Sequence, residues 1–336
     1  MSDWAARNVF WHVYPLGFTS AEKVARAEGA VVHRLPKLIM WLDYAVDLGA
    51  SGLLLGPIFQ SSSHGYDTTD YYVIDPRLGD DADFDALIAA AHRRGLRVVL
   101  DGVFNHVGRD FPAFQRAIAQ GPTSPDAGLF RIAFDQRSAD GTPSYGNFEG
   151  HEQLPALNHN NPAVADLIVE VMKHWLARGA DGWRLDAAYA VPRPFWARVL
   201  PRVRADFPDA YIFGEVIHGD YVDFVRESTV DSVTEYELWK AIWSVSTRPR
   251  PRIRCVCLIA TVLWAGLRRD DMWTACFPRL TPGLRGGLVA FEERGHADRR
   301  PTSRSTEEGG GVVFRRGYRG RTRRRRSRSR AAEGQA

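Results

Sequence analysis

Two short apolar runs, each ending in a carboxylate, constrain the fold of this 336-residue chain most strongly. They are Gly182–Asp186 and Tyr211–Glu215. The segment between them is long enough for one helix and two turns, which is the spacing of a strand–helix–strand repeat. Consecutive parallel strands in such a repeat lie side by side, so we expect Asp186 and Glu215 to project from the carboxyl ends of neighbouring strands. A carboxylate pair held about 5 Å apart can carry out retaining glycoside hydrolysis.

The rest of the first 246 residues follows the same alternation. Apolar and β-branched runs predict strands at residues 8–14, 52–57, 97–101, 182–186, 211–215 and 232–235. Apolar residues at helical spacing predict helices over residues 35–48, 83–95, 161–179 and 235–243. Six βα units in a row indicate an α/β fold with a parallel sheet. Their regular succession favours an incomplete (β/α)8 TIM barrel over an open doubly wound sheet.

Details of two helices can be predicted as well. The helix over residues 35–48 should bury one face made of Leu38, Trp41, Leu42, Ala45 and Leu48. Asp83 is the expected N-cap of the helix that follows it and ends near Gly95. No Gly-x-Gly-x-x-Gly follows the first strand, which argues against a dinucleotide site there.

One connection is unusually long. Residues 107–161 separate the third strand from its helix, and they are rich in Gly, Pro, Asp and aromatic residues. Loops of this length are usually functional, and in a barrel this one would rise over the carboxyl ends of the strands.

Charge divides the chain into two parts. The whole chain carries +4, but residues 247–336 contain 22 Arg, no Lys and 8 acidic residues, which leaves −10 for residues 1–246. All three cysteines also lie in the basic part, so the acidic part has no thiol for a disulfide or a metal. The N-terminus lacks the apolar core of a signal peptide, and the longest apolar run, 255–267, is too short to cross a bilayer. We therefore expect a cytoplasmic protein without a membrane partner.

Five motifs resemble the α-amylase family of glycoside hydrolases, in the order and at the spacing of that family. They are residues 64–71 (HGYDTTDY), 101–106 (DGVFNH), 154–158 (LPALN), 182–186 (GWRLD) and 214–215 (GE). The LPALN form is most similar to the neopullulanase and cyclomaltodextrinase-like branch. The resemblance implies that residues 1–244 form a partial catalytic barrel and that residues 107–161 are a domain B-like insertion.

The resemblance also implies a role for each motif residue. Asp186 would be the nucleophile and Glu215 the acid and then base, which requires a raised pKa at Glu215. Arg184 would hold Asp186 ionised and oriented. Asp101 and His106 would grip sugar hydroxyls, and Tyr66 would offer its ring to the same sugar. Taken singly, each residue also fits a structural role, such as a helix cap, an ion pair or a core aromatic.

The sequence also departs from the family pattern. It contains no His-Asp dipeptide, and the family places its third catalytic carboxylate in an Asn-His-Asp at the end of strand seven. The resemblance ends near residue 244, so we expect the chain to be impaired in hydrolysing α-glucosidic bonds of glucans or oligosaccharides. A sugar-binding protein without turnover is the alternative. No metal or cofactor is expected, although Asn105 matches a calcium ligand of some amylases.

Two interpretations of residues 245–336 remain. Arginine runs such as residues 321–330 are typical of disordered arms that bind nucleic acid. Arginine without lysine, together with a rise in Cys, Pro and Gly, is instead typical of a GC-rich gene translated out of frame, and we favour this second interpretation. In that case residues 245–336 would be disordered.

Overall fold

A computed structural model describes residues 4–25, 30–138 and 141–247 of the chain. Its main sheet has six parallel strands in the order β1 (Phe10–Val13), β2 (Gly52–Leu55), β5 (Arg97–Gly102), β10 (Gly182–Leu185), β11 (Tyr211–Gly214) and β12 (Ser232–Val233). Each strand pairs with the one that precedes it in this order, and each lies within or close to a predicted strand. The expected α/β class and parallel sheet are therefore confirmed.

The sheet curls as the wall of a barrel does. Four strand steps separate β1 from β11, which would place them about 19 Å apart in a flat sheet. The rings of Phe10 on β1 and Tyr211 on β11 nevertheless stack, with centroids 6.2 Å apart and an angle of 4° between their planes. The two side chains can meet only because the sheet bends toward them. The predicted incomplete (β/α)8 architecture is confirmed by this curvature and by the strand order.

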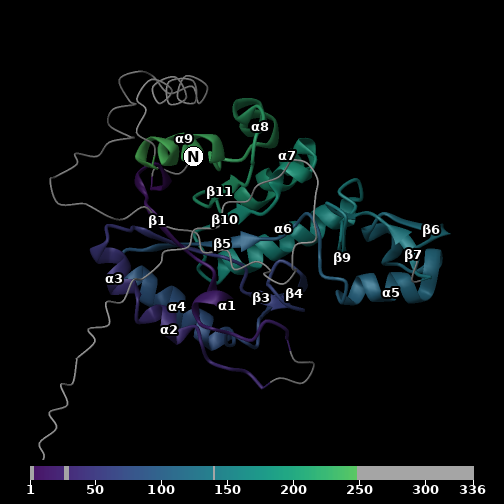
Figure 1. Ribbon diagram of the computed structural model, residues 1–336, viewed down its shortest axis with the longest axis horizontal. Helices are drawn as coiled ribbons and strands as arrows, with labels where there is room; N and C mark the ends of the chain where they lie inside the picture. The colour runs from purple at the N-terminus through teal and green to yellow at the C-terminus, as the bar shows by residue number, and fades with distance from the viewer. Residues whose placement is uncertain (1–3, 26–29, 139–140, 248–336) are drawn as a thin grey trace, which may run out of the picture. The chain divides into compact units, whose positions relative to one another are not determined.

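Helices cover the outer face of the sheet in chain order (Figure 1). Neighbouring helices pack against one another; Trp175 of α6, for example, meets Phe84 of α4 edge-on at 5.0 Å. The outer layer comprises α2 (Pro36–Ile39), α3 (Leu42–Asp47), α4 (Asp81–Arg93), α6 (Pro162–Ala177), α7 (Arg193–Arg204), α8 (Tyr221–Ser228) and α9 (Tyr236–Thr247). Short elements complete the barrel part: η1 (Ala5–Arg7), α1 (Pro15–Phe18), η4 (Ala188–Ala190), and the hairpin β3 (Phe59–Ser61) and β4 (Thr68–Ile74).

The predictions for the helix over residues 35–48 were wrong in part. The helix expected over residues 35–48 is broken into α2 and α3, because Trp41 bonds to the carbonyl of Leu38 and shortens the turn between them. Leu38, Leu42 and Ala45 are buried as expected, whereas Trp41 and Leu48 are exposed.

The N-cap of α4 is Asp80, not Asp83. The side chain of Asp80 accepts bonds from the amides of Ala82 and Asp83, and the side chain of Asp83 accepts one from the amide of Asp80. This reciprocal capping box satisfies the free amides of the first turn. The run of nearby aspartates made the choice between the two positions ambiguous from sequence.

The segment between β5 and α6 has its own secondary structure. It contains α5 (Pro112–Gln120), η2 (Gly121–Thr123), η3 (Ala127–Leu129) and two antiparallel pairs, β6 (Ile132–Arg137) with β7 (Pro143–Tyr145) and β8 (Asn147–Phe148) with β9 (His151–Pro155). These elements gather beside the sheet in Figure 1. A bridge between His106 and Ala156 joins the second pair to the segment that leaves β5. The end of this insertion therefore lies at the carboxyl edge of the sheet.

The predicted boundary at residue 244 falls inside a helix, because α9 continues to Thr247. Residues 248–336, and with them the predictions of disorder, frameshift and nucleic-acid binding, lie outside the described residues. Within the described ranges, no helix is long and apolar enough to cross a bilayer.

Candidate active site

The ends of β10 and β11 bring the two predicted catalytic carboxylates to one edge of the sheet. Leu185 is the register partner of Gly214, so Asp186 and Glu215 occupy equivalent positions one residue further along. Backbone bonds fix both positions, since the amide of Asp186 donates to Gly102 at 3.0 Å and that of Glu215 donates to Leu185 at 2.9 Å. The expectation that both residues follow neighbouring strands is confirmed.

Arg184 joins these carboxylates to a third, Asp101. Arg184 and Asp101 are register partners on β10 and β5, and Nη1 of Arg184 lies 2.5 and 2.6 Å from the two oxygens of Asp101. The same nitrogen lies 3.3 Å from Oδ1 of Asp186, and Nη2 lies 2.8 Å from Oε1 of Glu215. One guanidinium therefore contacts three carboxylates at the carboxyl ends of three adjacent strands.

The charges in this cluster do not balance if every group is ionised. Burial raises the pKa of Asp186 well above its usual value, the negative charge of Asp101 adds to this, and Arg184 opposes it. Burial likewise raises the pKa of Asp101 to about 6, against the opposing effect of Arg184. Three carboxylates around one cation favour retention of a proton, and these shifts place it on Asp186 or Asp101.

Glu215 behaves differently from the other two carboxylates. Burial acts to raise its pKa, but the charge of Arg184 and the hydrogen bonds that Glu215 accepts outweigh it, so the pKa of Glu215 is lowered. The hydroxyl of Tyr236 lies 2.7 Å from Oε1, and the amide of Ala187 lies 3.0 Å from Oε2. These directions are the reverse of those expected from the acid and nucleophile roles, because Arg184 bonds most closely to Asp101 and Glu215 rather than to Asp186.

Tyr66 and His106 lie at the same edge as the carboxylates. The hydroxyl of Tyr66 is 3.4 Å from Oδ2 of Asp101. Nε2 of His106 is 3.1 Å from the carbonyl of Tyr66, and the His106 ring stacks on Phe148 with centroids 4.7 Å apart. Burial lowers the pKa of His106 to about 4, so the ring is neutral at physiological pH. All six predicted site residues are thus linked through direct contacts.

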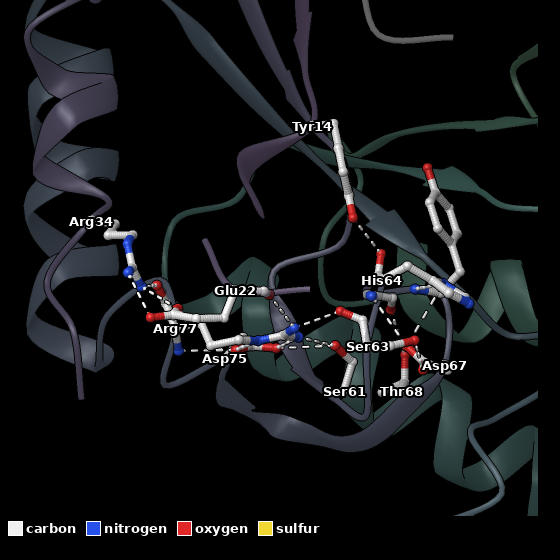
Figure 2. Close-up of polar contacts among 12 residues, drawn as sticks. Tyr14, Glu22, Arg34, Ser61, Ser63, His64, Asp67, Thr68, Asp75 and Arg77 are labelled. Atoms are coloured by element: carbon white, nitrogen blue, oxygen red, sulfur yellow. Dashed lines mark hydrogen bonds and ion pairs between the residues drawn. The ribbon is translucent and has the colours of Figure 1, made fainter. Parts of the chain in front are cut away.

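A buried ion pair holds the loop that carries Tyr66 (Figure 2). Nε of Arg77 lies 2.8 Å from Oδ1 of Asp75, and Nη2 lies 2.6 Å from Oδ2 of the same carboxylate. Arg77 also donates to the hydroxyl of Ser61 at 2.8 Å and to the carbonyl of Ser63 at 2.6 Å. These bonds tie the segment that follows β4 to the end of β3 and to the start of the loop that carries Tyr66.

Sequence reasoning missed several residues that surround the carboxylates. Besides Tyr236, they are Phe148 against His106 and Tyr189, whose hydroxyl donates to Oε1 of Glu149 at 2.8 Å. The Tyr189–Glu149 bond joins the insertion to the segment after β10. An available signal for two of them was an aromatic residue within a few positions of a strand end, as Tyr189 follows Asp186 and Tyr236 follows β12.

Among the described residues, one group of potential metal ligands, His33, Asp80 and Asp83, is close enough to share an ion, but the two aspartates form the capping box of α4. Asn105, the residue considered for calcium, has its Nδ2 3.1 Å from Nδ1 of His106. Its role as a calcium ligand stays a prediction.

The family model described as "Alpha amylase, catalytic domain" matches residues 14–264, which extends past residue 244. A cyclomaltodextrinase of Geobacillus thermopakistaniensis is 34% identical over 251 residues, covering 70% of this chain and 42% of that relative. Neopullulanase 2 of Thermoactinomyces vulgaris is 34% identical over 250 residues, covering 70% of this chain and 43% of that relative.

Solved structures agree with this match. The cyclic alpha-maltosyl-(1→6)-maltose hydrolase of Arthrobacter globiformis has a TM-score of 0.69 at 30% identity, covering 79% of this chain and 63% of that structure. The chain spans less than half the length of the two curated relatives named above. The family model, however, matches most of the chain. This chain belongs to the alpha-amylase family of glycoside hydrolases.

Proposed function

We propose that this protein hydrolyses α-glucosidic bonds of maltooligosaccharides or cyclodextrins with retention of anomeric configuration. One observation carries the proposal: Asp186 and Glu215 end adjacent strands and both contact Arg184. The names of its relatives, which include cyclomaltodextrinase, maltogenic alpha-amylase and neopullulanase, support an α-glucan substrate. A relative named intracellular maltogenic amylase supports a cytoplasmic location.

The proposed reaction has two steps. In the first, the carboxylate of Asp186 attacks the anomeric carbon while the bond to the leaving oxygen breaks and Glu215 gives that oxygen its proton. In the second, the carboxylate of Glu215 takes a proton from water, and the resulting nucleophile displaces Asp186 from the anomeric carbon. The sugar leaves with its original configuration, and both carboxyl groups return to their starting protonation states.

The other site residues would hold the reacting sugar. Asp101 and His106 offer an acceptor and a neutral imidazole to its hydroxyls, and Tyr66 offers a ring next to them. Arg184 would stabilise the charge on Asp186. Substrate binding must also move the shared proton of the cluster to Glu215, since the site without sugar favours it on Asp186 or Asp101.

We propose further that turnover by this chain is slow. The given sequence has no His-Asp dipeptide, so the Asn-His-Asp motif that carries the family's third catalytic carboxylate is not found in it. Hydrogen bonds to sugar hydroxyls that strengthen in the transition state contribute several kcal/mol in this reaction class, roughly a hundredfold or more in rate. No metal or cofactor is invoked, so treatment with EDTA should leave the rate unchanged.

The test uses the full chain with maltoheptaose and with β-cyclodextrin. Proton NMR during early turnover should show the α-anomer as the first product, and Asp186→Asn should abolish its formation. Asp166→Asn, which alters an exposed carboxylate paired with Arg202, is the matched control and should keep the parent rate. The β-anomer as first product would rule out Asp186 as nucleophile.

Binding without turnover would favour the sugar-binding alternative. Isothermal titration with β-cyclodextrin distinguishes the two cases, because a hydrolase that is merely slow gives both an affinity and a measurable product. Affinity that survives Asp186→Asn while no product forms from the parent chain would replace hydrolysis with binding as the function.

A further inference from the structure

Donors from three elements hold the carboxylate of Glu215. Arg184 on β10 and Tyr236 on α9 both contact Oε1, at 2.8 and 2.7 Å, and the amide of Ala187 contacts Oε2 at 3.0 Å. The arginine and the amide can only donate hydrogen bonds. Tyr236 is the one donor of the three whose group can also accept, because a phenol hydroxyl rotates about its C–O bond.

The position of Tyr236 is fixed by the pairing of β12 with β11. Tyr236 is the first residue of α9, two positions after Thr234. The amide of Val216 donates to the hydroxyl of Thr234 at 2.9 Å, and that hydroxyl donates back to the carbonyl of Val216 at 3.0 Å. These two hydrogen bonds between the strand ends flank Glu215, so the start of α9 is held beside the carboxylate.

A hydrogen bond from Tyr236 changes the proton balance of the whole cluster. A donor that bonds to a carboxylate stabilises its charged form, and bonds to charged acceptors are stronger than bonds to neutral ones. The hydroxyl therefore favours ionised Glu215 and leaves the shared proton to Asp186 or Asp101. Among the described residues, His12 on β1, Tyr66 before β4 and Tyr189 in η4 also interact with the charge of Glu215.

We propose that Tyr236 is a positioning residue that decides which carboxylate of the cluster carries the proton. This inference rests on the proposed function, in which Glu215 must hold a proton at the moment of bond cleavage. When the hydroxyl donates a hydrogen bond, Glu215 is charged and has no proton to give to the leaving oxygen. When it rotates and accepts a bond from protonated Glu215, the proton lies where the first step needs it, and the contact between the two oxygens is kept.

The test measures protonation directly and needs no turnover. In the full chain labelled with ¹³C at the glutamate side-chain carboxyl, the resonance lost in Glu215→Gln identifies Glu215. Its pH titration should move upward by about one unit in Tyr236→Phe, the order of shift that loss of one hydrogen bond to a carboxylate produces. Tyr236→Leu lacks the hydroxyl as well and should move the titration in the same direction.

Tyr145→Phe is the matched control. Its hydroxyl also makes a 2.7 Å bond, but to the backbone carbonyl of Glu152 in the insertion, so its removal should leave the Glu215 titration in place. An unchanged or lowered titration midpoint in both Tyr236 variants would overturn the inference. A raised midpoint in a chain that releases no sugar would support the role of Tyr236 and count against hydrolysis, so the two proposals fail separately.

Discussion

Nη1 of Arg184 lies 2.5 and 2.6 Å from the two oxygens of Asp101, closer than its 3.3 Å contact with Asp186. The register of β5 and β10 sets this preference, because it places the two residues directly opposite each other. The site is therefore built on a structural ion pair between strands, and the predicted nucleophile receives a longer hydrogen bond from the same nitrogen.

Removing this cation should destabilise the fold in a pH-dependent way. In Arg184→Met, three buried carboxylates would face one another without a counter-ion, and breaking a buried pair typically costs about 3–5 kcal/mol. The loss should be largest near pH 7 and smaller at pH 5, because protonated carboxyls need no cation. Urea unfolding of parent and variant at both pH values measures the difference.

A surface pair supplies the comparison for this variant. Arg202 bonds to Asp166 at 2.8 Å with both side chains about half exposed. Arg202→Met should cost no more than about 1 kcal/mol, as exposed ion pairs do. Equal losses in the two variants, or a loss at Arg184 that does not depend on pH, would mean that the cluster is not a charge-balanced unit.

Glu215→Gln should nearly abolish release of sugar from natural glucans. The amide cannot give a proton to the leaving oxygen, and general acid catalysis contributes about 10²–10⁴-fold in rate. An activated substrate whose leaving group needs no proton, such as an α-glucosyl fluoride, should be much less affected in the first step. Glu227→Gln, at an exposed carboxylate paired with Arg193, is the control and should retain the parent rate.

The core of the site was predictable because it depends on strand order. Asp101, Arg184, Asp186 and Glu215 lie on or directly after strands whose apolar runs are evident in the sequence. Parallel pairing of consecutive strands then brings their carboxyl ends together whatever the loops do. The motif residues Tyr66 and His106 were found only through the family resemblance, since nothing in their local pattern indicates a site.

The parts that could not be predicted depend on loop conformation. Glu149, which accepts the hydrogen bond from Tyr189, has a left-handed backbone with φ of 50°, a conformation that residues other than glycine rarely adopt. The pairing of Tyr236 with Glu215 depends on where α9 begins after a two-residue strand. The protonation order within the cluster follows from hydrogen-bond distances, which sequence spacing does not contain.

His106 should make the protein sensitive to acid. The pKa of its buried ring is about 4 in the fold against 6.5 for the free side chain, so the unfolded chain binds the proton first as the pH falls. Its contribution is fully present above pH 6.5 and is lost as the pH falls through about 4, for a total of about 3 kcal/mol. His12, whose pKa is also lowered to about 4, acts in the same direction.

Asp101 opposes this loss of stability on acidification. Its raised pKa means that the fold binds the proton first, so its contribution grows as the pH falls from about 6 toward 3.8. Comparing the parent with His106→Gln by urea unfolding between pH 7.5 and 4.5 removes this shared effect. The variant should lose less stability on acidification than the parent. Parallel curves for parent and His106→Gln would contradict the buried neutral state.

Arg77→Met should disturb the Tyr66 loop as well as the stability of the fold. The side chain of Arg77 is buried and bonds to Asp75, Ser61 and Ser63, so its loss leaves a buried carboxylate without its cation. We expect a loss of about 3–5 kcal/mol in the free energy of unfolding at pH 7. Asp75→Asn combined with Arg77→Met should recover part of it, since both charges are then gone. Arg94→Met, which breaks the exposed pair with Asp43, should cost at most about 1 kcal/mol.

Because Ser63 lies at the start of the loop that carries Tyr66, affinity for β-cyclodextrin should fall in Arg77→Met even where the variant is fully folded. Unchanged affinity in the folded variant would show that Arg77 stabilises the hairpin without positioning Tyr66.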